Sequence, residues 1–502
     1  MKKISQLLFL VSALVIGFTS CQEDEAPDNG VTLTGIPATA TITAGATLGP
    51  VTATATALDG LLSLKITKDG VDFATVPLTG TTGTAPFSYT ALSADAGKNI
   101  VFTFTVTDVD GDFVTVTHVL TVGAEATTIK VSANITANTT WTTGKTYVLA
   151  GRIAVTSGAT LTIQPGVVVK GEVGSGSNAT ALIIARGAKI NAAGTATSPI
   201  IFTTVADEIA PGQISSPNLE PTLEGLWGGL IVLGNARGSF AGDVTETQIE
   251  GIPASDPNGR YGGTIDADNS GVIKYVSIRH GGANIGEGNE INGLTLGGVG
   301  SGTVIENVEV IANQDDGIEF FGGSVSVKNA LIWNSGDDAI DTDQAWSGTV
   351  DNFIIICGTN TDHALEIDGP EGTLLTSNTV KNGSVKGHPK SEFGDFRDGA
   401  RGTFENIYFF NFSAPSDDTN AGRGDLSLSG DKTLATFAAG TLKFTKLQAS
   451  LKEGVTLATA FRNGTDASAS TVALKANTVG ADKSVFVGWT AAEKLGALAD
   501  FK

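Results

Sequence analysis

Four segments with one pattern decide the fold of this chain: Asn292-Gly293-Leu294-Thr295, Asp316-Gly317-Ile318-Glu319, Asp338-Ala339-Ile340-Asp341 and His363-Ala364-Leu365-Glu366. They recur at intervals of about 22 to 25 residues, and apolar stretches precede the last three at 304–311, 325–333 and 350–356. A period of about 20 to 30 residues, with short strands and small-residue turns, is typical of coils stacked in a solenoid. The pattern therefore predicts a repeat architecture rather than one compact core.

The solenoid that fits these residues is a right-handed parallel β-helix, an all-β fold, over residues 129–440. One coil cannot bury its inward side chains alone, but coils stacked about 4.8 Å apart pair every strand with the next. The inward positions include Ile318, Ile340 and Leu365, and β-branched residues dominate the repeats. The main competitor at this period is a leucine-rich repeat, and its leucine–asparagine ladder is absent from the sequence.

Different patterns flank the predicted β-helix. Residues 31–123 alternate apolar and polar side chains in short runs, with Asp110-Gly111 between two of them, which predicts an immunoglobulin-like β-sandwich. Residues 441–502 are expected to supply the last coils and close the far end of the solenoid. Thr490-Ala491-Ala492-Glu493 is a capping-box pattern that opens a short helix there.

The N-terminus has the pattern of a lipoprotein signal peptide over residues 1–20. Lys2 and Lys3 precede an apolar run at 7–18, and a small-residue cleavage site ends at Cys21. We expect the mature protein to begin at Cys21, acylated by chains such as palmitate. This anchor would join the protein to membrane lipid without a transmembrane helix.

The tether after the anchor adds a direction to that prediction. Residues 21–30 are polar, acidic and contain Pro and Gly, as flexible linkers do. The acidic run at 22–25 resembles the surface-export signal of Bacteroidetes-type lipoproteins. The resemblance implies a lipid-anchored protein of the outer membrane that faces the extracellular side. An ordinary periplasm-facing lipoprotein is the alternative.

Charge and cysteine content limit the partners. The full chain has a formal net charge of -21, which repels nucleic acid and offers many oxygen ligands to divalent cations. We therefore expect no nucleic-acid binding. The chain has two cysteines, so an acylated Cys21 leaves Cys357 without a disulfide partner. Because Cys357 follows an apolar run, we expect it to be a small buried side chain.

Carboxylates gather at equivalent positions of successive coils. In register, Asp315, Asp316 and Glu319 should lie beneath Asp337, Asp338, Asp341 and Asp343, with Asp362, His363, Glu366 and Asp368 one coil further. Acidic groups one coil apart repel each other unless a cation or a proton intervenes. We expect calcium ligands among Asp315, Asp337 and Asp362. The expected ligand-binding residues are Glu319, Asp341, Asp343, Trp346, Glu366 and Asp368, with Trp346 as an exposed aromatic platform.

Five of the polar residues resemble the motifs of polygalacturonase-like glycoside hydrolases in order and approximate spacing: Asp316, Asp337, Asp338, His363 and Arg397. The resemblance implies that Asp338 is the general acid and that Asp316 and Asp337 place the water. Inversion requires carboxyl groups about 6.5 to 9.5 Å apart. Two features depart from the family: His363 lacks flanking glycines, and Gly399 stands where a lysine is expected.

Over residues 140–440 the chain is similar to β-helix lipoproteins of Bacteroidetes-type bacteria. The likeness rests on Leu226-Trp227-Gly228-Gly229 and on the segment Asp315 to Gly323. It implies the fold and the location, but no activity. Pectate lyases share the solenoid, yet their Trp-x-Asp-His and Arg-x-Pro-x-x-Arg motifs are absent here.

The sequence favours a surface lipoprotein whose β-helix binds extracellular polysaccharide or another surface partner without catalysis. An inverting polygalacturonase-like glycoside hydrolase is the second hypothesis. A third is an accessory subunit of a TonB-dependent uptake complex in the outer membrane. A purely structural role for the carboxylates, in turns or around calcium, also fits the pattern.

Overall fold

The computed structural model describes residues 30–123, 127–285, 291–415 and 424–502. The chain forms two compact units, which divide between Ala126 and Thr127. The predicted signal peptide 1–20, the predicted acylation site Cys21 and all but the last residue of the tether lie outside the described residues. Within the described ranges, the helices are too short or too polar to cross a membrane.

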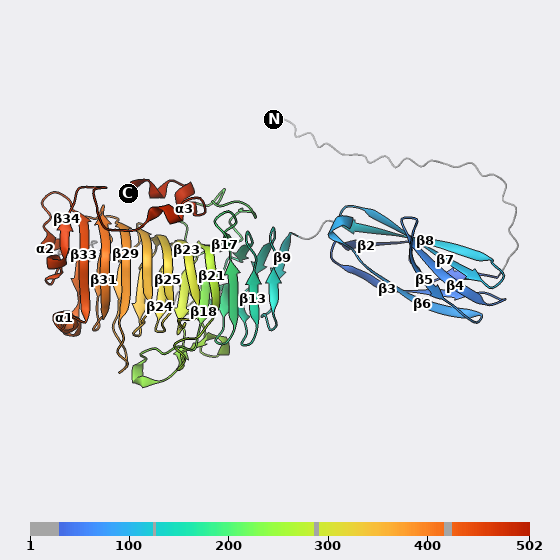
Figure 1. Cartoon of the computed structure of the whole chain (residues 1–502), viewed down its shortest axis with the longest axis horizontal. Helices are drawn as coiled ribbons and strands as arrows, with labels where there is room; N and C mark the ends of the chain where they lie inside the picture. The colour runs from blue at the N-terminus through green and yellow to red at the C-terminus, as the bar shows by residue number, and fades with distance from the viewer. Residues whose placement is uncertain (1–29, 124–126, 286–290, 416–423) are drawn as a thin grey trace, which may run out of the picture. The chain divides into compact units, whose positions relative to one another are not determined.

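The first unit consists of two β-sheets that share one hydrophobic core (Figure 1). One sheet contains, in spatial order, β1 (Thr32–Thr34), β3 (Thr47–Thr56) and β6 (Thr82–Thr90). The other contains β2 (Thr39–Thr43), β8 (Phe113–Gly123), β7 (Asn99–Asp108), β4 (Leu61–Lys68) and β5 (Val71–Pro77). Phe87 of β6 meets Phe102 and Phe104 of β7 edge to face in this core. The immunoglobulin-like assignment of the unit stays a prediction.

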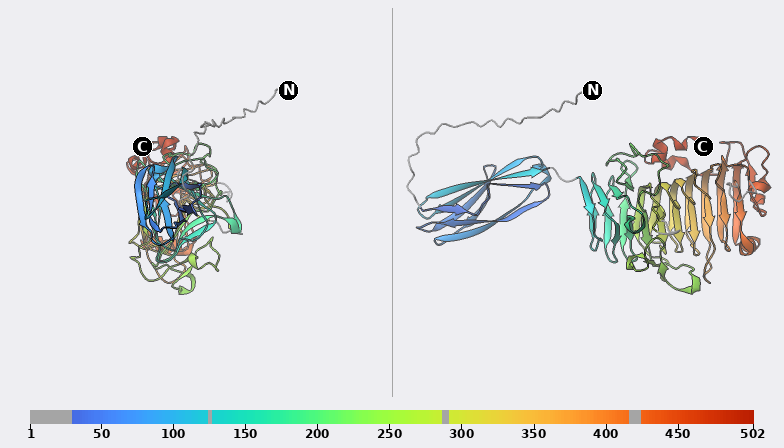
Figure 2. Two further views of the ribbon diagram at one scale, coloured as in Figure 1. Left: turned by 90° about the vertical axis from the view of Figure 1, so that its right-hand side faces the viewer. Right: turned by 180° about the vertical axis from the view of Figure 1, so that it is seen from behind.

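The second unit is a stack of parallel coils (Figures 1 and 2). Its longer sheet contains β9 (Thr128–Val131), β10 (Thr139–Trp141), β11 (Thr146–Leu149), β13 (Thr160–Ile163), β14 (Val168–Gly171), β16 (Lys189–Ala193), β17 (Ile200–Thr204), β21 (Gly271–Arg279), β23 (Val304–Asn313), β25 (Ser326–Ser335), β27 (Thr349–Ile356), β29 (Asn378–Lys386), β31 (Gly402–Phe410), β33 (Leu442–Ser450) and β34 (Ala469–Thr471). Its shorter sheet contains β12 (Arg152–Val155), β15 (Ala181–Ile184), β18 (Leu230–Leu233), β22 (Leu294–Gly297), β24 (Ile318–Phe321), β26 (Ile340–Asp343), β28 (Leu365–Ile367), β30 (Gly394–Phe396) and β32 (Leu426–Leu428). The predicted all-β, parallel β-helix is confirmed.

The register of the shorter sheet explains the repeated segments. Ile318, Ile340 and Leu365 lie directly above one another, and all three are buried in the central hydrophobic cluster. Side chains alternate between the two faces of a strand, so the next residue in each segment points outward. A one-residue change of register would exchange the two sets, which is why the apolar period fixes the stacking so strongly.

Asparagine bends the long strands at one corner of the coils. Asn307, Asn329 and Asn352 have φ angles of 58°, 59° and 64°, a left-handed conformation that asparagine tolerates better than most residues. Each side chain also binds its neighbour in the stack: Nδ2 of Asn329 donates to Oδ1 of Asn307 at 2.9 Å, and Nδ2 of Asn352 donates to Oδ1 of Asn329 at 2.8 Å. The corner therefore keeps its bend in successive coils.

A long loop covers part of the outer face of the shorter sheet. We call residues 234–262 the covering loop; it is the green loop at the lower edge of the solenoid in Figure 1. Its elements are η3 (Ala241–Asp243), β19 (Thr247–Gln248), η4 (Pro257–Gly259) and β20 (Arg260–Tyr261). Phe240, Ile249 and Tyr261 of the loop form a hydrophobic cluster with Ile183 and Ile231 of the sheet.

The C-terminal region closes the far end only in part. Parallel pairing continues through β33 and β34, and α1 (Gly430–Ala438) and α2 (Leu457–Ala460) lie near these last strands (Figure 1). The predicted helix is present as α3 (Ala491–Lys494), and Thr490 caps it. However, α3 lies against the longer sheet beside β23, several coils before the end of the stack.

Apolar contacts with the longer sheet explain the position of α3. Phe486 and Trp489 near this helix share a buried cluster with Leu331 and Ile354 on the outer face of the longer sheet. The carboxylate of Glu309 accepts hydrogen bonds from the backbone N–H groups of Ala491 and Ala492 at 3.2 and 2.9 Å. The expectation that the final helix closes the end was therefore wrong: the segment around this helix instead covers outward apolar side chains of the longer sheet and removes them from water.

Candidate functional site

The outer face of the shorter sheet carries a row of acidic side chains. Glu319 of β24, Asp341 of β26, Glu366 of β28 and Asp395 of β30 are in parallel register. The first three are 5%, 8% and 6% exposed, which is unusual for carboxylates. We call this row, together with Asp316, Asp338, Asp343, His363, Asp368 and Arg397 beside it, the acidic face.

A second row lies just before each strand and connects the coils. The backbone N–H of Asp316 donates to Oδ1 of Asn292 at 3.2 Å, and that of Asp338 donates to Oδ1 of Asp316 at 2.8 Å. The N–H of His363 continues the series, donating to Oδ1 of Asp338 at 2.7 Å. Each side chain in the row therefore satisfies a peptide group of the next coil, which explains why a polar residue opens every repeated segment.

His363 is the positive centre of the second row. Its Nδ1 lies 2.8 Å from Asp338 and 3.6 Å from Glu366, and its Nε2 lies 3.9 Å from Glu392. Burial opposes a charge on the imidazole, but the hydrogen bond and charge of Asp338 outweigh it and raise the pKa of His363 to about 10. Burial raises the pKa of Asp338 to about 7, although its contact with His363 opposes the rise. The favoured state of the pair is an imidazolium beside a carboxylate.

The carboxylates nearer the covering loop have no such partner. Oxygens of Asp316, Glu319 and Asp341 lie within 4.8 Å of one another, and all three side chains are buried. Burial, and then the charge of neighbouring carboxylates, raises the pKa of each well above its usual range. Protons or a cation must therefore neutralise this group of three.

An arginine balances the other edge of the acidic face. Arg397 forms ion pairs with Glu366 and with Asp368, the latter at 2.6 Å between Nε and Oδ1. The side chain of Arg397 is 42% exposed, so solvent reaches this edge. Burial raises the pKa of Asp368 to about 8 and that of Asp343 to about 6, and in both cases nearby carboxylates add to the effect.

The three expected calcium ligands fall into two groups. Oxygens of Asp315 and Asp337 lie within 4.8 Å of each other and of Asp316, whereas Asp362 groups with His363 and Glu392. Asp337 is exposed, and the side chain of Asp362 is 56% exposed. Asp315 and Asp337 can therefore share a cation at the solvent-exposed edge of the acidic face, which we call the rim. Asp362 belongs to a separate position on this rim.

The expectation for Trp346 was wrong. This side chain is 2% exposed and stacks on Phe320 inside the coils, with ring centroids 4.1 Å apart. Its Nε1 donates to the carbonyl oxygen of Val325 at 2.9 Å. Trp346 follows the turn after β26, where the chain bends toward the interior of the coils. The side chain that we expected to be an exposed platform is therefore part of the core.

Sequence reasoning missed three neighbours of the acidic face. Asn292 heads the same row as Asp316, and its place in the repeated series was a usable signal. Glu392 meets His363 from the next coil, where a longer insertion hides the period. Glu250 of the covering loop lies 3.3 Å from Nδ2 of Asn292, and no periodic pattern marks it.

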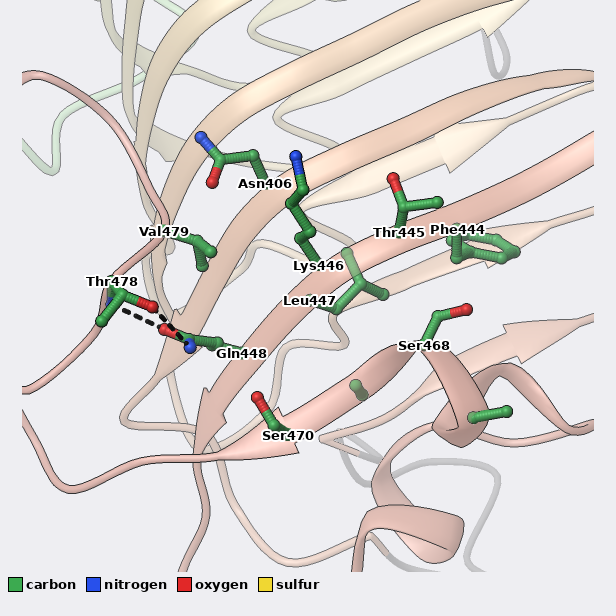
Figure 3. Close-up of a pocket in the computed structure, with 12 residues that line it drawn as sticks. Asn406, Phe444, Thr445, Lys446, Leu447, Gln448, Ser468, Ser470, Thr478 and Val479 are labelled. Atoms are coloured by element: carbon green, nitrogen blue, oxygen red, sulfur yellow. Dashed lines mark hydrogen bonds between the residues drawn. The ribbon is translucent and has the colours of Figure 1, made fainter.

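A separate groove of about 720 Å³ lies away from the acidic face, on the last coils (Figure 3). Its lining includes Asn406, Lys446 and Gln448, and the amide of Gln448 is held by two hydrogen bonds to Thr478. Lys446 pairs with Glu405 at 2.8 Å. The groove therefore shares no residue with the predicted site.

The comparisons with known proteins agree with this architecture. The family described as pectate-lyase like beta helix domain matches residues 133–493, well over half of the chain and all of the acidic face. The chain belongs to this family. Membership accounts for the parallel β-helix and assigns no role to the carboxylates.

Two further comparisons add little. No curated protein matches the chain. Among solved structures, the catalytic unit of the thermostable GH87 alpha-1,3-glucanase from Streptomyces thermodiastaticus strain HF3-3 is 12% identical, covers 87% of this chain and 98% of that chain, and has a TM-score of 0.21. A likeness of that size carries no argument about the site.

Proposed function

We propose that this protein binds extracellular polysaccharide at the rim of the acidic face and does not cleave it. Calcium held by Asp315 and Asp337, with Asp362 at a second position, would bridge to hydroxyl or carboxylate oxygens of the polymer. Arg397 offers a partly exposed guanidinium at the opposite edge. Membership of a pectate-lyase like β-helix family supports a carbohydrate ligand.

The observation that carries the choice of binding over catalysis is the state of Asp338. This residue, the general acid that the polygalacturonase-like resemblance implies, is 1% exposed. Its Oδ1 already accepts hydrogen bonds from both the N–H and the Nδ1 of His363. A general acid must come within hydrogen-bond reach of the glycosidic oxygen, and this carboxyl is held inside the coil.

We propose the same location that the N-terminal sequence predicts. An acylated Cys21 would anchor the protein in the outer membrane, with the tether 21–30 and an immunoglobulin-like unit leading to a right-handed β-helix on the extracellular side. Labelling of intact cells with an impermeant reagent tests the location. Labelling only after the outer membrane is opened would contradict it.

The functional test measures retention and cleavage together. The full chain is applied to immobilised acidic and neutral polysaccharides with calcium or with a chelator, and new reducing ends are counted. We expect calcium-dependent retention without new ends, and about tenfold weaker retention for Asp337→Asn. Asp395→Asn, in the outward row of β30, is the matched control and should bind like the wild type.

An inverting glycoside hydrolase is the second candidate, because a buried carboxyl with a pKa near 7 suits a general acid. New reducing ends that disappear in Asp338→Asn would establish this candidate and overturn the binding-only proposal. Circular dichroism of the variant distinguishes a specific loss of activity from a loss of folding.

A further inference from the structure

Three buried carboxylates of the acidic face form a group whose charge nothing nearby balances. Asp316 and Glu319 come from one coil and Asp341 from the next, and their exposed fractions are 7%, 5% and 8%. In the described parts of the chain, no Lys, Arg or His forms an ion pair with any of them. The two nearby cationic residues, His363 and Arg397, contact other carboxylates instead.

The hydrogen bonds around these three carboxylates leave one buried oxygen atom without a partner. Asp316 uses Oδ1 to accept the N–H of Asp338, and Glu319 uses Oε2 to accept Nδ2 of Asn292. Asp341 is more than nine-tenths buried, yet its Oδ1 has no hydrogen-bond partner. An unpartnered carboxylate oxygen in such a place is costly unless a ligand fills it.

We infer that Asp316, Glu319 and Asp341 bind one divalent cation of the calcium class beneath the edge of the covering loop. Oxygens of the three residues lie within 4.8 Å of one another, a span that a cation with bonds of about 2.3 to 2.6 Å bridges. The donors are all oxygen atoms, which favours calcium over zinc, a metal that prefers nitrogen and sulfur.

This site shares Asp316 with the rim group of the proposed function and takes its other two ligands from the outward row of the shorter sheet. The rim group consists of Asp315, Asp316 and Asp337, whereas Glu319 and Asp341 belong only to the buried group. Glu250 of the covering loop reaches Asn292, which in turn holds Glu319. A bound cation would therefore fix the covering loop to the coils, whether or not a polysaccharide binds at the rim.

Calorimetric titration of the chelator-treated full chain with calcium chloride tests the inference. We expect Asp341→Asn to weaken a calcium-binding event at least tenfold, while Asp337→Asn leaves that event unchanged. Asp395→Asn is the matched control, because Asp395 occupies the same outward row and accepts hydrogen bonds from Ser427 and Ser429. Titrations with magnesium and zinc chloride should give weaker binding than calcium.

Thermal unfolding keeps the test informative if a variant folds poorly. Without a cation, Asp341→Asn should unfold at a higher temperature than the wild type, because an amide needs no proton to stay neutral among these carboxylates. Calcium should raise the unfolding temperature of the wild type more than that of the variant. If the calcium-binding event that Asp337→Asn leaves unchanged also survives Asp341→Asn, or if a folded wild-type chain lacks that event, the inference is overturned. Loss of polysaccharide retention alone would overturn only the proposed function.

Discussion

One row of outward side chains on the shorter sheet has two contrasting halves. Ile183 and Ile231 occupy the row on β15 and β18, and Glu319, Asp341 and Glu366 occupy the same row on β24, β26 and β28. Both halves are buried, but only the apolar half lies in the hydrophobic cluster with the covering loop.

The difference between the halves separates stability from function. Covering Ile183 and Ile231 removes apolar surface from water and is favourable by itself. Burying carboxylates is unfavourable unless each gains a partner, and Arg397 and His363 balance only some of them. Selection for stability alone would have continued the isoleucines, so the acidic half is where we propose the cation site.

The largest expected effect comes from placing a charge in the apolar half. Ile231→Asp should lower the free energy of unfolding by more than about 5 kcal/mol, because it removes a buried side chain and leaves an unpaired charge. Urea unfolding measures the change. Ile231→Val, which keeps the cluster apolar, should lose only about 1 kcal/mol. Equal losses for the two variants would mean that charge does not distinguish the halves.

Removing the positive centre of the acidic half should have the next largest effect. His363→Ala leaves Asp338 without its imidazolium and should lower the free energy of unfolding by about 3 to 5 kcal/mol at neutral pH. The loss should shrink at pH 5, because Asp338 can then take up a proton. A loss of the same size at both pH values would show that packing, and not charge, is the role of His363.

The pH dependence of stability should follow the acidic half. The folded-state pKa values of Asp343, Asp338 and Asp368 are about 6, 7 and 8, all above the ordinary carboxyl value. The folded protein therefore binds more protons than the unfolded chain, and stability is lost as the pH rises through these values.

His363, with a pKa of about 10 in the folded protein, stays charged over this range, whereas in the unfolded chain it loses its proton near pH 6.5; its stabilising effect therefore also declines from about pH 6.5 to pH 10. In a chelator, we expect the free energy of unfolding to fall from pH 5 to pH 9 by several kcal/mol. Urea unfolding at these pH values gives the slope. A rise with pH would contradict the assigned charges.

The smallest effect is expected where the acidic row ends. Asp395 is half-buried and accepts hydrogen bonds from two serine hydroxyl groups, at 2.9 and 2.6 Å. Asp395→Asn should change the free energy of unfolding by less than about 0.5 kcal/mol, since the side chain keeps an acceptor there. A larger change would show that repulsion between the carboxylates of this row also acts on Asp395 of β30.

The sequence predicted the coils because their inward residues recur with one period. Ile318, Ile340 and Leu365 mark that period, and the polar residues next to them mark the acidic face. The sequence could not show which carboxylates find partners, because the partners come from other segments. Arg397 lies a coil away, and Glu250 belongs to a loop without a period.

Trp346 and the C-terminal helix show the same limit. The position of Trp346 depends on where the chain bends after β26, and that of α3 depends on an apolar patch formed by distant strands. Local patterns correctly predicted that α3 is a helix capped by Thr490. They carried no information on the surface that α3 would cover.

The most direct measurement is an anomalous difference map from crystals of the full chain soaked in terbium, which replaces calcium at oxygen sites. The account predicts a peak among Asp316, Glu319 and Asp341, with any rim peak near Asp337 separate from it. An acidic face without any peak, in crystals that diffract well and at a pH above 7, would contradict it. The carboxylates would then be neutralised by protons alone.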